Sequence, residues 1–310
     1  MCVILQSMQS RYQSNGLAWI DLESPTPAEI QNIINEFGIA ASIAEELLLP
    51  SGKPRAEFYE HYLYIIFHFP ALRHSHTMRE QEIDFIVGKD FIITAHQETI
   101  DPLHKFSKVF EVNSVLQTNN FGDHAGFIFF YMVKKMYKAV EHELEYLHRD
   151  LNEIEEHIFS GHEAEMVAAI SQSARDLLNL RQTIEPHHEV LHDLESQGVQ
   201  LFGAEFAPYL RALSNEYYRV HTHIMRETDS LHELRETNNS LLTTKQNETM
   251  KVFTIMAFFT FPLALISGIL NMDSAHNPIK GLPYDFWIVT GILCITGFIM
   301  FLYFKKKKWL

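Results

Sequence analysis

The chain has 310 residues, of which 25 are Lys or Arg and 39 are Asp or Glu, so its formal net charge is −14. Such an acidic surface repels the phosphates of nucleic acid, which excludes nucleic acid as an expected partner, and it attracts cations. The two cysteines, Cys2 and Cys294, lie near opposite ends of the sequence and exclude a disulfide framework or a thiolate metal cluster. No export signal precedes the soluble part, which we expect to stay in the reducing cytosol.

Residues 1–125 combine strand and helix patterns and are predicted to form a cytosolic α/β domain. Runs rich in β-branched and aromatic residues predict strands at 17–22, 62–69, 82–87 and 91–95. The corner Gly88-Lys89-Asp90 should join the last two strands as a hairpin. The run Ser24-Pro25-Thr26-Pro27 predicts a cap before a helix at 28–37. We expect all the strands to share one sheet.

Residues 126–207 are predicted to form an acidic helical hairpin. Apolar heptad positions give the first helix one seam, which consists of Phe130, Val133, Tyr137, Val140, Leu144, Leu147, Leu151, Ile154 and Ile158. Ser160-Gly161 ends this helix, and a second helix follows that is bent at Pro186. The apolar seam of the second helix is predicted to combine two heptad registers, with Val167, Ala174 and His188 in one and Ile170, Leu177, Ile184 and Leu191 in the other.

The outer face of the first helix of this hairpin carries six glutamates, Glu141, Glu143, Glu145, Glu153, Glu155 and Glu156. We interpret them as the solvated face of an exposed helix rather than as a metal site.

Residues 208–251 are predicted to form a long stalk helix. No Gly or Pro interrupts residues 209–261, so the helix should continue into the apolar stretch that follows, and its pattern breaks only at Pro262. The stretches 252–270 and 286–304 each hold nineteen residues without Asp, Glu, Lys or Arg. Each is long enough to cross a bilayer once as a helix.

We therefore predict two transmembrane helices, an extracytoplasmic loop at 271–285 between them, and a basic cytosolic tail at 305–310. Lys251 precedes the first stretch and four lysines follow the second at 305–308. The bias of positive charge toward the cytosolic side places both termini in the cytoplasm, in a multi-pass protein of the inner (plasma) membrane.

Three segments resemble the CorA-type magnesium and divalent cation channel family. They are NETMKVFTIMAFFTFPLALISGI at 247–269, the ending YFKKKKWL at 303–310, and LLNLRQTIEPHHEVLHDL at 177–194. The resemblance implies a CorA-like homopentamer in which the α/β domains form a cytosolic funnel. It also implies that the long helix and the first membrane helix line the pore, with the second membrane helix outside it.

The chain departs from the family at its hallmark motif. Where the family has Gly-Met-Asn after the first membrane helix, this sequence has Asn271-Met272-Asp273. The resemblance implies that these residues form the outer mouth, where oxygen atoms meet a divalent ion that keeps its hydration shell. Five copies of Asp273 would add negative charge there. Asparagine, here Asn271, is second only to glycine in tolerating a left-handed backbone. The zinc-transporting ZntB branch also departs from the motif.

The residues that match pore positions of the family are Asn247, Met250, Phe253, Ala257, Phe261, Ala264 and Gly268. Asn247 would be the polar metal-contacting residue at the cytosolic entrance, together with Asn271, Met272 and Asp273 at the outer end. Phe253 and Phe261 would be hydrophobic constrictions that gate by dewetting. Packing against a neighbouring subunit explains the same residues equally well.

The family also senses cytosolic Mg²⁺ through carboxylates between subunits, one of them in a Tyr-Phe-Arg-Asp-like segment. The matching segment here is Tyr209-Leu210-Arg211-Ala212, which lacks the carboxylate. Glu205 and Glu216 are the candidate replacements.

The resemblance predicts a channel that passes a hydrated divalent cation, most favourably Mg²⁺, down its electrochemical gradient, without a cofactor or enzymatic activity. A Zn²⁺, Co²⁺ or Ni²⁺ transporter is an alternative, because histidines gather at His187, His188, His192, His221 and His223. We interpret these more readily as exposed histidines than as zinc ligands, since no further ligand of fixed spacing completes a site. A non-conducting membrane sensor or scaffold, or an unselective pore, is the other alternative.

Overall fold

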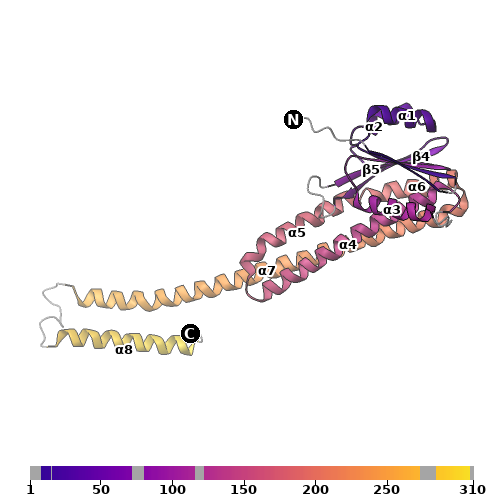
Figure 1. The fold of residues 1–310 in the computed structure, drawn as a ribbon. Coiled ribbons are helices and arrows are strands. Elements are labelled where there is room, and N and C mark those ends of the chain that lie inside the picture. Colours follow the sequence, from indigo (N-terminus) through magenta and orange to yellow (C-terminus); the bar gives the residue numbers. More distant parts are fainter. Residues whose placement is uncertain (1–7, 15, 72–79, 116–121, 273–283, 308–310) are drawn as a thin grey trace. The chain divides into compact units, whose positions relative to one another are not determined.

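The computed structural model describes residues 8–14, 16–71, 80–115, 122–272 and 284–307 (Figure 1). The chain divides into two compact units, Met1–Arg235 and Glu236–Leu310. The boundary falls inside one long helix, α7 (Ala207–Leu270).

The first unit contains a six-stranded sheet in the order β1-β2-β6-β5-β4-β3. Its strands are β1 (Met8–Ser14), β2 (Leu17–Glu23), β3 (Arg55–Phe58), β4 (Tyr62–Pro70), β5 (Glu80–Gly88) and β6 (Phe91–His96). Neighbours are antiparallel except β2 and β6, which run parallel. The four predicted strands and their common sheet are confirmed. Sequence patterns missed β1 and β3, which are the two edge strands.

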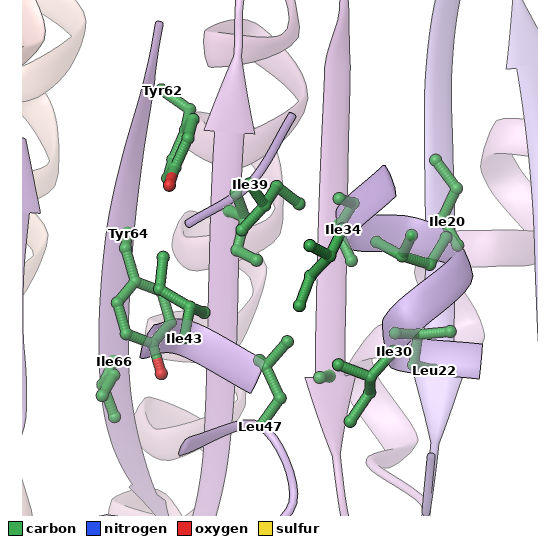
Figure 2. Close-up of a cluster of buried hydrophobic side chains, with 14 residues drawn as sticks. Ile20, Leu22, Ile30, Ile34, Ile39, Ile43, Leu47, Tyr62, Tyr64 and Ile66 are labelled. Atoms are coloured by element: carbon green, nitrogen blue, oxygen red, sulfur yellow. The ribbon is translucent and has the colours of Figure 1, made fainter. Parts of the chain in front are cut away.

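Two helices, α1 (Pro27–Phe37) and α2 (Ala41–Glu46), pack on one face of this sheet. The predicted cap at the start of α1 is confirmed, because Thr26 and Glu29 form a reciprocal capping box. Figure 2 shows Ile30 and Ile34 of α1 and Ile43 of α2 lying over the strands. They complete a cluster of buried aliphatic and tyrosine side chains that holds both helices to the sheet.

The opposite face packs against α3 (Asp101–Val115) and α4 (Ala125–Phe159). The Trp19 ring on β2 lies 5.7 Å from the ring of Phe110 on α3, and Phe85 on β5 lies 5.3 Å from Phe129 on α4. Buried Trp19 keeps its polar atom satisfied, since Nε1 donates to Thr94 Oγ1 at 2.9 Å. Both faces of the central strands are therefore buried, which explains why β4 reads as a continuous apolar run.

The helical hairpin consists of α4, which ends at the predicted Ser160-Gly161 break, and α5 (Glu163–Ile184). Every residue of the predicted α4 seam is buried. In the second helix, the register of Ile170, Leu177, Ile184 and Leu191 is buried as predicted. The other register was wrong: Val167 is 47% exposed, and the buried companions are Ser173, Leu180 and His187.

The predicted bend at Pro186 is a break between two helices. α5 ends at Ile184 and α6 (His187–Phe202) begins after Pro186. A short 3-10 turn, η1 (Ala204–Phe206), then leads into α7.

His187 is fully buried, so its interpretation as an exposed histidine was wrong. Its Nε2 donates to the backbone carbonyl of His68 at 2.8 Å, and its Nδ1 accepts from the Tyr137 hydroxyl at 2.9 Å. These two bonds fix a neutral imidazole in the core. Burial lowers the pKa of His187 to about 3.

A second buried ionisable group, Asp84, lies on β5 and is 4% exposed. Within the described part of the chain its Oδ1 has no hydrogen-bond partner. Burial raises the pKa of Asp84 to about 8, and the negative charges of Glu82 and Glu46 add to the effect, while Arg55 opposes it. Asp84 is thus a proton-binding group inside the sheet domain.

In the second unit, α7 continues as an uninterrupted helix to Leu270, past Pro262, where we had predicted that its pattern would break. The other helix is α8 (Asp285–Lys306). Both helices contain a segment long and apolar enough to cross a membrane, at the two predicted stretches.

Candidate functional site

The seven predicted pore residues lie on one side of α7. Because successive residues of an α-helix are turned by about 100°, Asn247, Met250, Phe253, Ala257, Phe261, Ala264 and Gly268 fall within a stripe roughly 120° wide. We call this set the α7 stripe. Its large side chains are uncovered in a single chain: Met250 is 57%, Phe253 61% and Phe261 71% exposed. Of the seven residues, only Ala257 is half-buried.

The opposite side of α7 packs against α8. A Cβ atom placed on Gly297 of α8 would lie 3.8 Å from Phe259 Cζ and 3.9 Å from Leu263 Cδ1. Phe259 and Leu263 are turned roughly half a revolution away from the centre of the α7 stripe. Both side chains are half-buried, as are Ile255 and Ile266 on the same side. Helix α8 thus contacts α7 at Phe259 and Leu263, on the side opposite the α7 stripe, and leaves the α7 stripe open.

Gly297 was not singled out from the sequence. The signal that could have found it is a glycine within an apolar stretch, which in membrane helices often marks close packing of two helices.

The α7 helix ends in a turn at Asn271. The backbone N–H of Asn271 donates to the carbonyl of Ser267 at 3.0 Å, and its side-chain Nδ2 donates to the same carbonyl at 2.8 Å. Among the described residues other than glycine, only Ser24 has a positive φ, so Asn271 does not adopt the left-handed backbone that we had expected. Met272 follows and is 62% exposed, whereas Asp273 lies outside the described residues.

The carboxylates considered for cation sensing are distributed over the first unit. Ala212 lies on α7, one turn before Glu216. Glu216 is engaged in ion pairs, with Oε2 2.7 Å from Arg219 Nη2 and Oε1 3.8 Å from Lys134 Nζ. Arg219 Nη2 also lies 2.6 Å from Glu141 Oε2, so Glu141 belongs to a contact between α4 and α7 rather than to the solvated face that we had assigned. Glu205 is exposed on η1.

The histidine cluster does not form a metal centre. No group of three or more His, Cys, Asp or Glu side chains in the described part of the chain is arranged to hold a metal ion. His188 Nε2 lies 3.1 Å from the Tyr218 hydroxyl, and His223 Nε2 lies 3.4 Å from Glu227 Oε1. His187 thus lies in the core, His188 joins α6 to α7, and His223 pairs with a residue one turn along its own helix.

Residues 14–306 match the family model described as "CorA-like Mg2+ transporter protein". A cobalt/magnesium transport protein CorA from Thermotoga maritima is 26% identical over 299 residues, which cover 96% of this chain and 84% of that protein. The solved structure of the CorA magnesium transporter from Methanocaldococcus jannaschii superposes with a TM-score of 0.85 at 18% identity and covers 100% of both chains. The cytoplasmic domain of ZntB from Vibrio parahaemolyticus covers 77% of this chain and 98% of its own, with a TM-score of 0.63 at 10% identity.

Proposed function

The chain belongs to the CorA family of divalent cation transporters, and on this premise we propose that it passes hydrated Mg²⁺ across the inner membrane through a pore formed by five copies. No cofactor takes part, because the family transports ions rather than transforming a substrate. The divalent cation is the cargo.

The observation that carries the proposal is the division of α7 into two sides. One side contacts α8 at Phe259 and Leu263, and the other presents the α7 stripe with no cover from its own chain. A helix placed in a membrane with one covered and one open side can surround an axis together with copies of itself. The residues that then face the axis are those that match the pore positions of the family.

The two ends of the α7 stripe supply the oxygen atoms that a hydrated cation would meet. At the outer end, the Asn271 amide nitrogen is bound to the Ser267 carbonyl, which leaves the side-chain oxygen Oδ1 for the ion's water shell. Asp273 adds a carboxylate there, and Asn247 supplies the amide at the inner end. Because Mg²⁺ gives up its waters reluctantly, contact through the hydration shell suits it better than direct ligation by many protein groups.

The membrane potential supplies the driving force. Each elementary charge gains about 2.3 kcal/mol per 100 mV, so a divalent cation gains roughly twice that on entering the cytoplasm. Orientation with both termini in the cytoplasm is part of this proposal and follows from the lysines at 305–308.

Recordings in planar bilayers test this function through the proposed gate. The intact chain should carry a Mg²⁺ current at constant membrane tension, and Phe253→Ala combined with Phe261→Ala should raise it severalfold, because two hydrophobic constrictions are removed. Phe298→Ala on α8 is the matched control, since this phenylalanine is 62% exposed and lies outside the α7 stripe. It should leave the current unchanged.

The alternatives predict different recordings. A non-conducting sensor or scaffold gives no current with or without membrane stretch, and an unselective pore carries Na⁺ as readily as Mg²⁺. A Zn²⁺ transporter, an option that the resemblance to the ZntB domain keeps open, gives a current that Zn²⁺ carries and Mg²⁺ does not. Each of these results would contradict the proposal.

A further inference from the structure

Helix α5 is flanked by two grooves of opposite charge. The first, which we call the basic groove, lies between α5 and α7 and has a volume of about 300 Å³. Its apolar lining includes Ala174, Leu178 and Leu231, and its basic lining consists of Arg181, His232 and Arg235. Among the residues that the structure describes, no acidic side chain lines it.

The second, which we call the acidic groove, lies between α4 and α5 and has a volume of about 500 Å³. It also has an apolar part, formed by Ile154, Met166 and Ala169. Its charged lining is Asp150, Glu153 and Asp176, with His157 as the one basic side chain. Both grooves lie within the first unit, where α4, α5 and α7 run alongside one another (Figure 1).

The basic side chains of this groove have few partners within the described part of their own chain. In the described part of the chain, Arg235 and His232 form no ion pair and no side-chain hydrogen bond, and both are exposed. Arg181 has a partner, Glu185, at 3.5 Å, but both side chains are about half exposed, and such a pair stabilises weakly. Leu178 beside them is 51% exposed.

Two different complementary surfaces on one chain are what a ring requires. Copies that cross a membrane in the same orientation are related by rotation about the membrane normal, so each copy offers one surface to the next copy and another to the previous one. With a net charge of −14, copies repel one another in general. A cationic groove placed against an anionic groove removes that repulsion at the contact.

We propose that the face of one copy that carries the basic groove packs against the acidic groove of the next copy. Leu178 then enters the apolar part of the acidic groove, and Arg181 and Arg235 face Glu153 and Asp176. This inference rests on one part of the proposed function, namely that copies of the chain form a ring. It adds the two surfaces by which neighbouring cytosolic units bind each other.

Cysteine cross-linking between two tagged forms of the full-length chain tests this contact. Both forms carry Cys2→Ser and Cys294→Ser; one carries Leu178→Cys and the other Glu153→Cys. With one cysteine in each chain, no cross-link can form within a chain. After co-expression and oxidation in membranes, the two tags should appear together in one cross-linked dimer. Glu155→Cys is the control, because Glu155 is exposed but lies on another side of α4 and outside the groove; its dimer yield should be at least fivefold lower.

Charge reversal makes the test specific. Arg235→Glu in the Leu178→Cys form should lower the yield of mixed dimer severalfold, because it places like charges together. Asp176→Arg in the Glu153→Cys form should then restore the yield in that pair. Restoration by a second reversal would not follow from unfolding of either variant.

Three outcomes overturn the inference: dimers of one tag only, equal yields for Glu153→Cys and Glu155→Cys, or no dimer. A fatty acid found bound to the purified chain by mass spectrometry, with no cross-link, would assign the basic groove to an amphipathic anion instead. Native mass and ion flux are measured on the same samples. A pentamer that conducts without cross-linking refutes only the proposed contact between the two grooves. An absence of both pentamer and flux refutes the proposed function.

Discussion

Liposomes that contain the full-length chain should take up Mg²⁺, and Asp273→Ala should lower the initial rate at micromolar Mg²⁺ by about tenfold, which corresponds to about 1.4 kcal/mol. A ring of five carboxylates at the outer mouth would concentrate divalent cations there, and the substitution would remove the charge. At millimolar Mg²⁺ the difference should shrink, because the mouth is then occupied without electrostatic help. A fluorescent Mg²⁺ indicator inside the vesicles measures the rate.

Asp285→Ala is the matched control for this experiment. Asp285 lies at the start of α8, near the other end of the same loop in sequence, and in the described structure its carboxylate accepts from the backbone N–H of Phe286 at 2.7 Å. The substitution removes this local contact and should leave the uptake rate within about twofold. Equal losses in both variants would mean that both negative charges contribute alike and that position 273 has no special role. No loss in either would contradict the assignment of Asp273 to the mouth.

Asp273→Asn separates charge from shape. It restores the amide that the family has at this position, so uptake should persist but need a higher Mg²⁺ concentration. Adding Zn²⁺ to the same vesicles distinguishes the cargo, since a Mg²⁺ pathway should lose little flux at equimolar Zn²⁺.

The free energy of unfolding should fall as the pH rises from about 6.5 to 8, by up to about 1.4 kcal/mol per pH unit from Asp84 alone. The pKa of Asp84 is raised from 3.8 to about 8 by burial, so the folded chain binds a proton that the unfolded chain has already lost. Stability from this group is complete below pH 3.8 and is lost as the pH approaches 8. Asp84→Asn should remove this loss and stabilise the chain at pH 8.

His187 has the opposite effect in a lower range. Its pKa is lowered from 6.5 to about 3 by burial, so between these values the unfolded chain binds the extra proton and stability falls as the pH falls. From about pH 4 to 6.5 the two groups oppose each other, and their effects should nearly cancel. Above pH 6.5 only the Asp84 effect of this pair remains.

Denaturant titrations of the full-length chain in detergent, at intervals from pH 5 to 8.5, measure these slopes. Asp90→Asn is the control, since Asp90 is exposed in the turn between β5 and β6, and it should keep the wild-type slope. Some slope should remain in Asp84→Asn. Burial lowers the pKa of His96, but the hydrogen bond and charge of Asp21 outweigh this and raise it overall, so its contribution is also lost at high pH. A wild-type chain whose stability rises from pH 6.5 to 8 would contradict the prediction.

The parts of the fold that sequence patterns predicted are those in which one side of an element is apolar throughout. The α4 seam is one case, and β4 is another, because all nine of its residues are buried. β1 was missed because it is an edge strand, and its polar sequence, MQSRYQS, lacks the apolar pattern by which strands are predicted. In α5, Val167 and Ala174 competed with Ser173 and Leu180 for the core, and only packing against the neighbouring helices decides between such registers.

The candidate site also has a part that could be predicted from the sequence and a part that could not. The resemblance to the family supplied the pore residues from Met250 to Gly268, and their spacing of three and four residues places them in one stripe on one helix. Which side of α7 faces α8 depends on the contact of Gly297 with Phe259 and Leu263, and spacing within α7 carries no information about that contact. The burial of His187 was equally hidden, because its two partners, His68 and Tyr137, are far away in the sequence.

Pro262 has no amide hydrogen, yet α7 passes through it as a helix. The backbone carbonyl of Phe258, four residues earlier, therefore loses the donor that helical geometry would give it. In hydrocarbon such an unsatisfied oxygen costs several kcal/mol, whereas the water of the proposed pore would satisfy it. The helix is also easiest to flex at this point, so a hinge here could tilt the segment that carries Ala264 and Gly268 without disturbing Phe253.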